Sequence, residues 1–377
     1  MSAHAGPDAK AAPAHAAGLL ADLSAGLAAA LHDAGQAAGQ VQNLQRLTGG
    51  ASQQTWAFEL QPADGPAQPL ILRRAAAAGA PSRGGGPGLA AEAALIQRAA
   101  LGGVPVPVVQ CLLRPAHGLG EGFVMRRLPG ETLGRRIASA PRPRLAWQCG
   151  QALARIHQLP LSELPPLRCH QPRQALSHLA DWHASHRRAR PVFEWALRWL
   201  AEHAPADVAP TLVHGDFRNG NLMVDLAADG GALVGVLDWE LAQLGDAMAD
   251  LGWLGGASWR FGHGERPVGG FGQWAELLGG YRAAGGVIDL GRLRWWQVLG
   301  TLRWGVICDG MAQAWLSSAE PVMEKAAIGR RASEAECDLL QLLAPRAESA
   351  PTPAASRQAP RRGQEDLGAA RRFLESH

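Results

Sequence analysis

The sequence predicts an α+β chain of two lobes, a small β-rich amino-terminal lobe and a larger, mostly helical carboxy-terminal lobe. The chain has 377 residues, which is more than a single hydrophobic core usually serves. From about residue 44 to residue 125, short runs of apolar residues end at glycine or proline turns, as is typical of strands. From residue 133 onward, apolar residues recur at helical spacing, except around residues 211–240.

The small lobe is expected over residues 18–127. Two strands around a Gly-Gly turn are predicted by LQRLTGGASQQTWAFELQ, and a third strand by LILRR. One helix with a glycine stop is predicted by LAAEAALIQRAALGG. Two further strands are predicted by VPVPVVQCLLR and GFVMRRL.

The larger lobe is expected over residues 128–344. Amphipathic helices are predicted by RPRLAWQCGQALARIHQL, HLADWHASH and FEWALRWLAEHA. Strands return in TLVHGD, NLMVD and ALVGVLDWE, and the last two should pair as a hairpin. Residues 1–17 and 345–377 are rich in alanine and proline, so we expect them to be disordered tails.

Charge and cysteine content exclude several classes of partner and location. The formal net charge of +3 gives no case for binding nucleic acid or a membrane. The five cysteines are widely spaced and form no Cys-x-x-Cys motif, so we expect reduced thiols in a cytoplasmic protein. We see no signal peptide and no apolar run of about 18 residues. The sequence does not indicate an oligomeric state.

The chemistry concentrates in the stretch TLVHGDFRNGNLMVD and the following VLDWE. The chain has only three asparagines, and two of them, Asn219 and Asn221, lie within five residues of a His-Gly-Asp. Tight turns also use asparagine, so a purely structural interpretation exists. The predicted hairpin should bring Asn221 close to Asp238, with Asp216 just before it. An aspartate that orients a nucleophile, together with an Asn/Asp pair for a divalent cation, is the pattern of phosphoryl transfer.

These residues resemble the catalytic loop and metal-binding strand of the aminoglycoside phosphotransferase and choline kinase superfamily, whose members have a protein-kinase-like bilobal fold. The resemblance extends over most of residues 40–340 and includes LTGGASQQTW, EAALIQRA and GDAMADLGWL. More narrowly, LILRR, VPVP, HGDFRNGN and LDWE resemble the phosphotransferase-like domains found with acyl-CoA dehydrogenases. In that subgroup hydroxylated acyl thioesters are a suspected substrate class.

The resemblance implies a role for each residue of the central block. Asp216 would be the catalytic base, His214 would support the loop, and Arg218 would meet an anionic substrate or form a structural ion pair. Asn221 and Asp238 would hold Mg²⁺, while Glu240 would be either a second ligand or an outer acceptor. Asp250 would buttress the loop.

The nucleotide side departs from the protein-kinase pattern. No lysine occurs between Lys10 and Lys325, so the phosphate-binding lysine is missing. We expect Arg73, on the strand face opposite Leu70 and Leu72, to replace it with Glu92 as partner, and Arg74 is the alternative.

The first hairpin offers Gly49, Gly50 and Ser52 for phosphate contact, although Gly-Gly is also an ordinary turn. His157, on the apolar face of a predicted helix, is interpreted as structural because no neighbouring residue completes a metal or acid–base set.

The sequence therefore predicts a small-molecule kinase that uses ATP, with GTP as an alternative, and Mg²⁺. A hydroxyacyl-CoA or related hydroxy compound is the leading acceptor, and an aminoglycoside or choline-type alcohol is the alternative. A catalytically silent nucleotide-binding module is a second class of hypothesis. A metal-dependent hydrolase built from Asp216, Asp238 and Glu240 is a third class.

Overall fold

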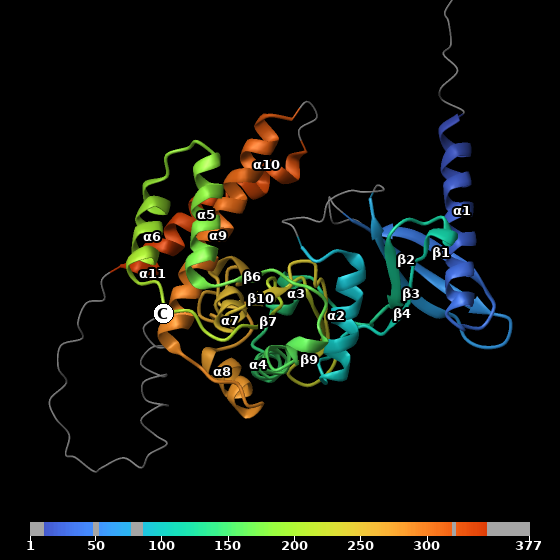
Figure 1. Ribbon diagram of the computed structural model, residues 1–377, viewed down its shortest axis with the longest axis horizontal. Helices are drawn as coiled ribbons and strands as arrows, with labels where there is room; N and C mark the ends of the chain where they lie inside the picture. Colours follow the sequence, from blue (N-terminus) through green and yellow to red (C-terminus); the bar gives the residue numbers. More distant parts are fainter. Residues whose placement is uncertain (1–10, 48–52, 77–85, 319–321, 345–377) are drawn as a thin grey trace, which may run out of the picture. The chain divides into compact units, whose positions relative to one another are not determined.

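The computed structural model describes residues 11–47, 53–76, 86–318 and 322–344, the side chains of residues 11–17 apart. It contains two compact units, which we describe separately (Figure 1). The first unit is made of Met1–Pro129, Ser162–Leu167 and Leu237–Ala242, and the second holds the remaining residues. The expected boundary after residue 127 therefore lies two residues from the observed one. The segment Leu237–Ala242 groups with the first unit, although the sequence analysis assigned it to the carboxy-terminal lobe.

The first unit is built on a five-stranded antiparallel sheet with the strand order β1-β2-β3-β5-β4. Its strands are β1 (Gly39–Leu47), β2 (Gln53–Pro62), β3 (Gln68–Ala75), β4 (Val109–Leu112) and β5 (Gly122–Arg126). Its helices are α1 (Ala11–Asp33), α2 (Leu89–Leu101) and the short η3 (Pro115–His117). The predicted strands and the predicted helix of this lobe are all present.

Helix α1 was not foreseen. It begins at Ala11, so the expectation of a disordered tail over residues 1–17 was wrong for residues 11–17. Leu23, Leu27 and Leu31 recur every four residues and form one face of this helix, and all three are buried against β2 and β3. Each such side chain contributes roughly 1.5–3 kcal/mol on burial. Leu70 and Leu72 of β3 belong to the same cluster, which leaves Arg73 for the opposite face of the sheet.

The second unit is mostly helical. Its helices are α3 (Gly134–Ile137), α4 (Pro143–His157), α5 (Pro172–Ser185), α6 (Pro191–Glu202), α7 (Met248–Leu254), α8 (Trp274–Ala283), α9 (Leu290–Leu316), α10 (Met323–Gly329) and α11 (Ala332–Leu343), with the short helix η5 (Ala257–Trp259). Another short helix, η4 (Leu161–Glu163), spans the boundary between the units. Strands β6 (Cys169–His170), β10 (Gln243–Gly245) and β7 (Thr211–Val213) form a small sheet in that order, and β8 (Leu222–Asp225) pairs with β9 (Ala232–Val236) as the predicted hairpin.

Helices α4 and α8 approach so closely that their contact requires glycine. A Cβ on Gly150 of α4 would lie 2.0 Å from the carbonyl oxygen of Leu277, and one on Gly280 of α8 would lie 2.0 Å from that of Trp147. Any larger residue would separate the two helices. This contact holds α4 in place, and α4 carries His157 of the site described below.

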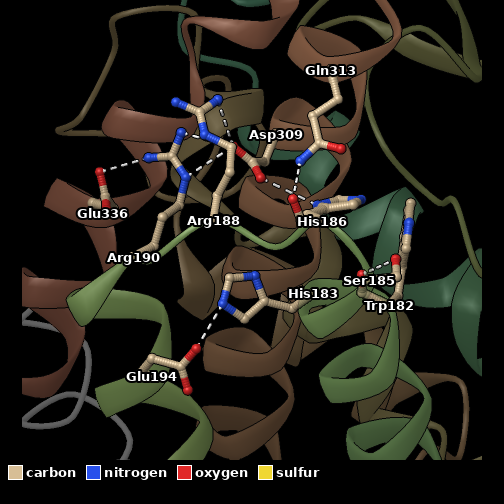
Figure 2. A network of polar contacts seen from close by, with 10 residues as sticks. All are labelled: Trp182, His183, Ser185, His186, Arg188, Arg190, Glu194, Asp309, Gln313 and Glu336. Carbon is tan, nitrogen blue, oxygen red and sulfur yellow. Dashed lines mark hydrogen bonds and ion pairs between the residues drawn. The ribbon is translucent and has the colours of Figure 1, made fainter. Parts of the chain in front are cut away.

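Helix α9 is tied to the connection between α5 and α6 by a buried carboxylate (Figure 2). Asp309 of α9 is fully buried, and its Oδ1 accepts hydrogen bonds from Nε and Nη2 of Arg190, at 3.0 and 2.9 Å. Arg188 forms an ion pair with the same carboxylate at 3.4 Å, and Nδ1 of His186 lies 3.2 Å from its Oδ2. This polar network fixes α9, which packs against α7 behind the loop that follows β7.

No helix within the described ranges is both long enough and apolar enough to cross a membrane.

Candidate active site

The loop that joins β7 to β8 is anchored by a buried carboxylate. Both oxygens of Asp250, on α7, accept backbone hydrogen bonds, from the N–H of His214 at 2.8 Å and from that of Gly215 at 2.9 Å. Burial alone would raise the pKa of Asp250. The hydrogen bonds and electrostatic attraction of His157 and His214 outweigh burial, so the pKa of Asp250 is lowered. An ionised carboxylate therefore holds the His-Gly-Asp turn.

His157 connects this carboxylate to α8. Its Nε2 lies 3.2 Å from Oδ2 of Asp250, and its Nδ1 lies 2.8 Å from the hydroxyl of Tyr281. These contacts agree with a structural role for His157. They also give it two side-chain partners, Asp250 and Tyr281, which the sequence did not indicate. His214 is itself fully buried, and its Nδ1 accepts the backbone N–H of Asp216 at 3.3 Å.

The carboxylate of Asp216 accepts hydrogen bonds from three side chains. Its Oδ1 accepts hydrogen bonds from Nε of Arg218 at 2.9 Å and from Nε1 of Trp253 at 2.8 Å. Its Oδ2 accepts the side-chain amide of Asn221 at 2.7 Å, and the same amide donates to the backbone carbonyl of Asp216 at 2.9 Å. These contacts orient the carboxylate. They also direct the amide nitrogen of Asn221 to Asp216, so the amide oxygen is the atom that a cation could use.

The second asparagine of the motif connects the loop to the segment that follows α7. Asn219 is 1% exposed, and its amide donates to the backbone carbonyls of Trp259 (3.1 Å) and Gly269. The guanidinium of Arg218 lies over the ring of Trp259, 4.7 Å from its centroid. Asn219 thus positions an aromatic ring beside the cation that bonds Asp216.

In the first unit, Arg73 is the centre of a separate charged cluster. Its Nη2 lies 2.6 Å from Oε1 of Gln53, 2.9 Å from Oδ1 of Asp238, 3.3 Å from Oε1 of Glu92 and 4.0 Å from Oε2 of Glu240. Burial alone would lower the pKa of Arg73. The negative charges of Glu92 and then Asp238 outweigh burial, so the pKa of Arg73 is raised.

Arg74 points elsewhere. It donates from Nε to Oε1 of Gln54 at 3.0 Å and from Nη1 to the carbonyl of Leu119 at 3.5 Å. Of the two arginines that the sequence offered, Arg73 is therefore the one beside Glu92.

Two features of this cluster carry an energetic cost. Glu92 is 1% exposed, and burial raises its pKa to about 7, with Arg73 opposing the shift and Asp238 and Glu240 adding to it. Asp238 has a φ of 65°, in the left-handed region that few residues other than glycine adopt. Strained or desolvated groups of this kind are concentrated at functional sites, so this cluster is a candidate site with a physical basis.

Some candidate residues are not placed. Gly49, Gly50 and Ser52 lie outside the described residues. The remaining candidates fall into two sets. Asp216, His214, Arg218 and Asn221 are in the second unit, and Arg73, Glu92, Asp238 and Glu240 are in the first.

Two further contacts were not predicted from the sequence. Gln53, which bonds Arg73, carried no recognisable signal. Trp253 lies three residues after Asp250 and so on the same side of α7, a helical spacing that could have pointed to the loop.

The donor set suits Mg²⁺ in its chemistry. In the described part of the chain, no cluster of three or more His, Cys, Asp or Glu side chains could hold a metal by itself. Mg²⁺ usually takes only one or two carboxylates, with nucleotide phosphates and water completing its coordination. Asp238 and Glu240 are such carboxylates, 30% and 19% exposed.

Comparison with solved structures identifies the fold. A Ralstonia eutropha protein provisionally assigned as an aminoglycoside phosphotransferase aligns with a TM-score of 0.63 and 19% identity, over 84% of this chain and 97% of that one. The GDP complex of aminoglycoside 2'-phosphotransferase-IIIa aligns with a TM-score of 0.55 and 11% identity, over 79% and 94% of the two chains. The prediction of a protein-kinase-like bilobal fold is confirmed.

Sequence comparison identifies the family. Residues 43–296 match the phosphotransferase enzyme family, and the chain belongs to that family. Acyl-CoA dehydrogenase family member 10 of Mus musculus is 31% identical over 176 residues, which cover 42% of this chain. The match covers only 16% of that longer protein. The predicted membership of a phosphotransferase family is therefore confirmed.

Proposed function

We propose that the protein transfers the γ-phosphoryl group of ATP, or of GTP, to a hydroxyl group of a small molecule, with Asp216 as the base. The observation that carries this proposal is the carboxylate of Asp216, oriented by Arg218, Trp253 and Asn221. A base held in one orientation directs a hydroxyl for in-line attack. The hydroxyl oxygen bonds to the γ-phosphorus, the bond from that phosphorus to the β–γ bridging oxygen breaks, and Asp216 takes the hydroxyl proton.

We assign the nucleotide side to the cluster around Arg73. Arg73 would contact the nucleotide phosphates with Glu92 as its partner, and Gly49, Gly50 and Ser52 would offer the hairpin backbone and a hydroxyl. Asn221, Asp238 and Glu240 would hold Mg²⁺, which when bound neutralises phosphate charge. A GDP complex is known for a relative of the same fold, which supports a nucleotide as the donor.

The acceptor we favour is a hydroxyacyl-CoA or a related anionic hydroxy compound. Acyl-CoA chemistry appears in the name of the mouse relative. The cation nearest to Asp216 is Arg218, 28% exposed. A polycationic aminoglycoside would be repelled by that charge, whereas a carboxylate or phosphate would be attracted.

We also propose a reducing, cytoplasmic setting. All five cysteines are free thiols, and Cys169 and Cys337 are exposed. Exposed thiols persist where the surroundings keep them reduced.

One observation favours the silent nucleotide-binding alternative. Arg73 lies 2.9 Å from Asp238, so the proposed metal ligand is paired with a cation. Catalysis requires that this pair opens when the nucleotide arrives. A pair that stays closed would give binding without turnover.

The test is ADP formation by the purified protein with MgATP and a panel of hydroxyacyl-CoAs, hydroxy acids, choline-like alcohols and aminoglycosides. Asp216→Asn is the matched blank, because it retains the shape of the side chain and removes the base. Turnover with one acceptor class, absent in the variant, would support the proposal and identify the acceptor. Thermal stabilisation by MgATP without turnover on any acceptor would support the silent module. The absence of both stabilisation and turnover would exclude the kinase proposal.

A further inference from the structure

An indole N–H reaches the candidate base from the helix behind it. Trp253, on α7, is 6% exposed, and its Nε1 donates to Oδ1 of Asp216 at 2.8 Å. A buried tryptophan usually finds some acceptor for this N–H, often a backbone carbonyl. Here the acceptor is the carboxylate on which the proposed reaction depends.

Trp253 is in turn held by a half-buried cation. The guanidinium of Arg303, on α9, lies 4.8 Å from the centroid of the Trp253 ring, and its Nη1 donates to the carbonyl of Gly215 at 3.2 Å. Burial lowers the pKa of Arg303, although Asp216 and then Asp250 oppose the shift. Desolvating a guanidinium is costly unless its charge is compensated, so the place of Arg303 against the His-Gly-Asp turn requires an explanation.

Close packing does not supply that explanation. A cavity of about 40 Å³ lies between the turn and α9, lined by Gly215, Asp250, Trp253, Trp296, Gly300 and Arg303 among others. Such a volume can hold one or a few water molecules. Because the space is not filled by side chains, directed polar contacts rather than shape must fix the turn from this side.

The donors on Asp216 determine which oxygen stays available. A carboxylate has about four lone-pair positions, two on each oxygen. Among the described residues, Oδ1 receives two donors, Arg218 and Trp253, and Oδ2 receives one, the amide of Asn221. One position therefore stays open, on Oδ2 and beside Asn221.

We propose that Trp253 and Arg303 are positioning residues, and that they present Oδ2 of Asp216 to the acceptor hydroxyl by occupying Oδ1. This inference rests on the proposed function, because it assigns an orientation to the base of that reaction. Without the indole N–H, Oδ1 regains an open position. The carboxylate can then accept the proton from the wrong side.

The test is a conservative substitution that removes only the donor. Trp253→Phe keeps an aromatic ring under Arg303 and deletes the N–H. We expect kcat for phosphate release from MgATP, with water as acceptor, to fall about 10- to 100-fold, with KM for MgATP within about 2-fold of wild type. Trp295→Phe is the matched control, because Trp295 is equally buried and donates its N–H to the carbonyl of Leu200, at 3.0 Å. It should leave kcat unchanged.

A spectroscopic measurement tests the contact without turnover. The indole ¹⁵N–¹H resonance of Trp253 is the one that disappears in Trp253→Phe. In Asp216→Asn this resonance should move, because its acceptor loses its charge, while that of Trp295 should stay. If Trp253→Phe does not fold, Arg303→Lys replaces it in the kinetic arm, with a fall in kcat of about 3- to 10-fold expected at unchanged KM, since lysine lacks the planar fork.

The outcomes separate this inference from the proposed function. A shifted Trp253 resonance together with a loss of kcat supports the positioning role. Unchanged kcat in Trp253→Phe overturns the positioning role, and so does a Trp253 indole resonance that does not move in Asp216→Asn. If wild-type protein binds MgATP but turns it over neither with water nor with any acceptor of the panel, the proposed function is the part that fails, and the resonance alone then decides between support and rejection of the contact.

Discussion

The carboxylate of Asp250 accepts a hydrogen bond from the backbone N–H of His214 at 2.8 Å, across 36 positions of the sequence. Its second oxygen takes the N–H of Gly215, and His157 holds the carboxylate from behind. Three donors from two segments converge on one buried anion. The geometry of the catalytic loop therefore depends on a residue that is not itself in the loop.

Asp250→Asn should destabilise the protein by about 2–3 kcal/mol, because the amide can accept only where its oxygen points and leaves one backbone donor unmatched. Urea denaturation monitored by tryptophan fluorescence measures this change. Asp229→Asn, at an exposed position on the β8–β9 connection, is the matched control and should stay within about 0.5 kcal/mol of wild type. Equal stability of the two variants would show that Asp250 does not anchor the loop.

Glu92 gives the protein a pH-dependent stability. Its pKa is raised to about 7 in the folded state, so the folded protein binds a proton that the unfolded chain has released above its ordinary pKa of about 4.3. Stability from this residue is fully present below that ordinary pKa and is lost as the pH rises through 7. The loss should approach about 3 to 4 kcal/mol at pH 8.5.

Glu92→Gln should remove this dependence, because the amide stays neutral at every pH. Unfolding midpoints in urea, measured from pH 5 to pH 8.5, should fall for wild type more steeply than for the variant. Glu121→Gln, at an exposed position in the same unit, should follow wild type. A variant curve as steep as that of wild type would contradict the assignment to Glu92.

The two arginines of β3 differ in their expected effect on nucleotide binding. Arg73→Met removes a cation with contacts to Glu92 and Asp238, and KM for MgATP should rise about 10- to 100-fold, as expected for the loss of charge-assisted hydrogen bonds. Arg74→Met is the matched control, since Arg74 bonds Gln54 instead, and it should change KM less than about 3-fold. Steady-state kinetics or calorimetric titration with MgATP distinguishes them. A larger effect at Arg74 would reverse the assignment.

Much of the fold could be predicted because its signals are local. The β8–β9 hairpin follows from alternating apolar residues on either side of Gly230 and Gly231, and both glycines have positive φ values. Helix α1 was missed because its alanine-rich start suggested a tail, although Leu23, Leu27 and Leu31 carried a helical spacing.

The candidate site could be predicted only in part, because its contacts join distant segments. The pairing of Arg73 with Glu92 was inferred from strand alternation and a family pattern. The contact between Trp253 and Asp216 spans 37 positions, and residues 128–344 contain twelve tryptophans. Only the helical spacing of Trp253 from Asp250 distinguishes it from the others. The grouping of Leu237–Ala242 with the first unit could not be predicted from the sequence either, because the chain continues from β9 without a linker.

Arg218 gives the sharpest test of the acceptor class. The residue bonds Asp216 and the carbonyl of Asn219 and lies over Trp259, yet it is 28% exposed. If it also meets an anionic group of the acceptor, Arg218→Gln should raise KM for a hydroxyacyl-CoA or hydroxy acid at least about 10-fold, since hydrogen bonds to charged groups have that magnitude. KM for MgATP should stay unchanged, and Arg218→Lys should recover part of the loss.

The same variants separate this role from a purely structural ion pair. Were Arg218 only a support for Asp216, Arg218→Gln would lower kcat for every acceptor and leave acceptor KM values as they are. Arg198→Gln, at an exposed position on α6, is the matched control for the loss of one positive charge and should change neither constant. A rise in acceptor KM with Arg198→Gln as well would point to a general effect of net charge. A rise confined to Arg218 would place the anionic group of the acceptor beside the base.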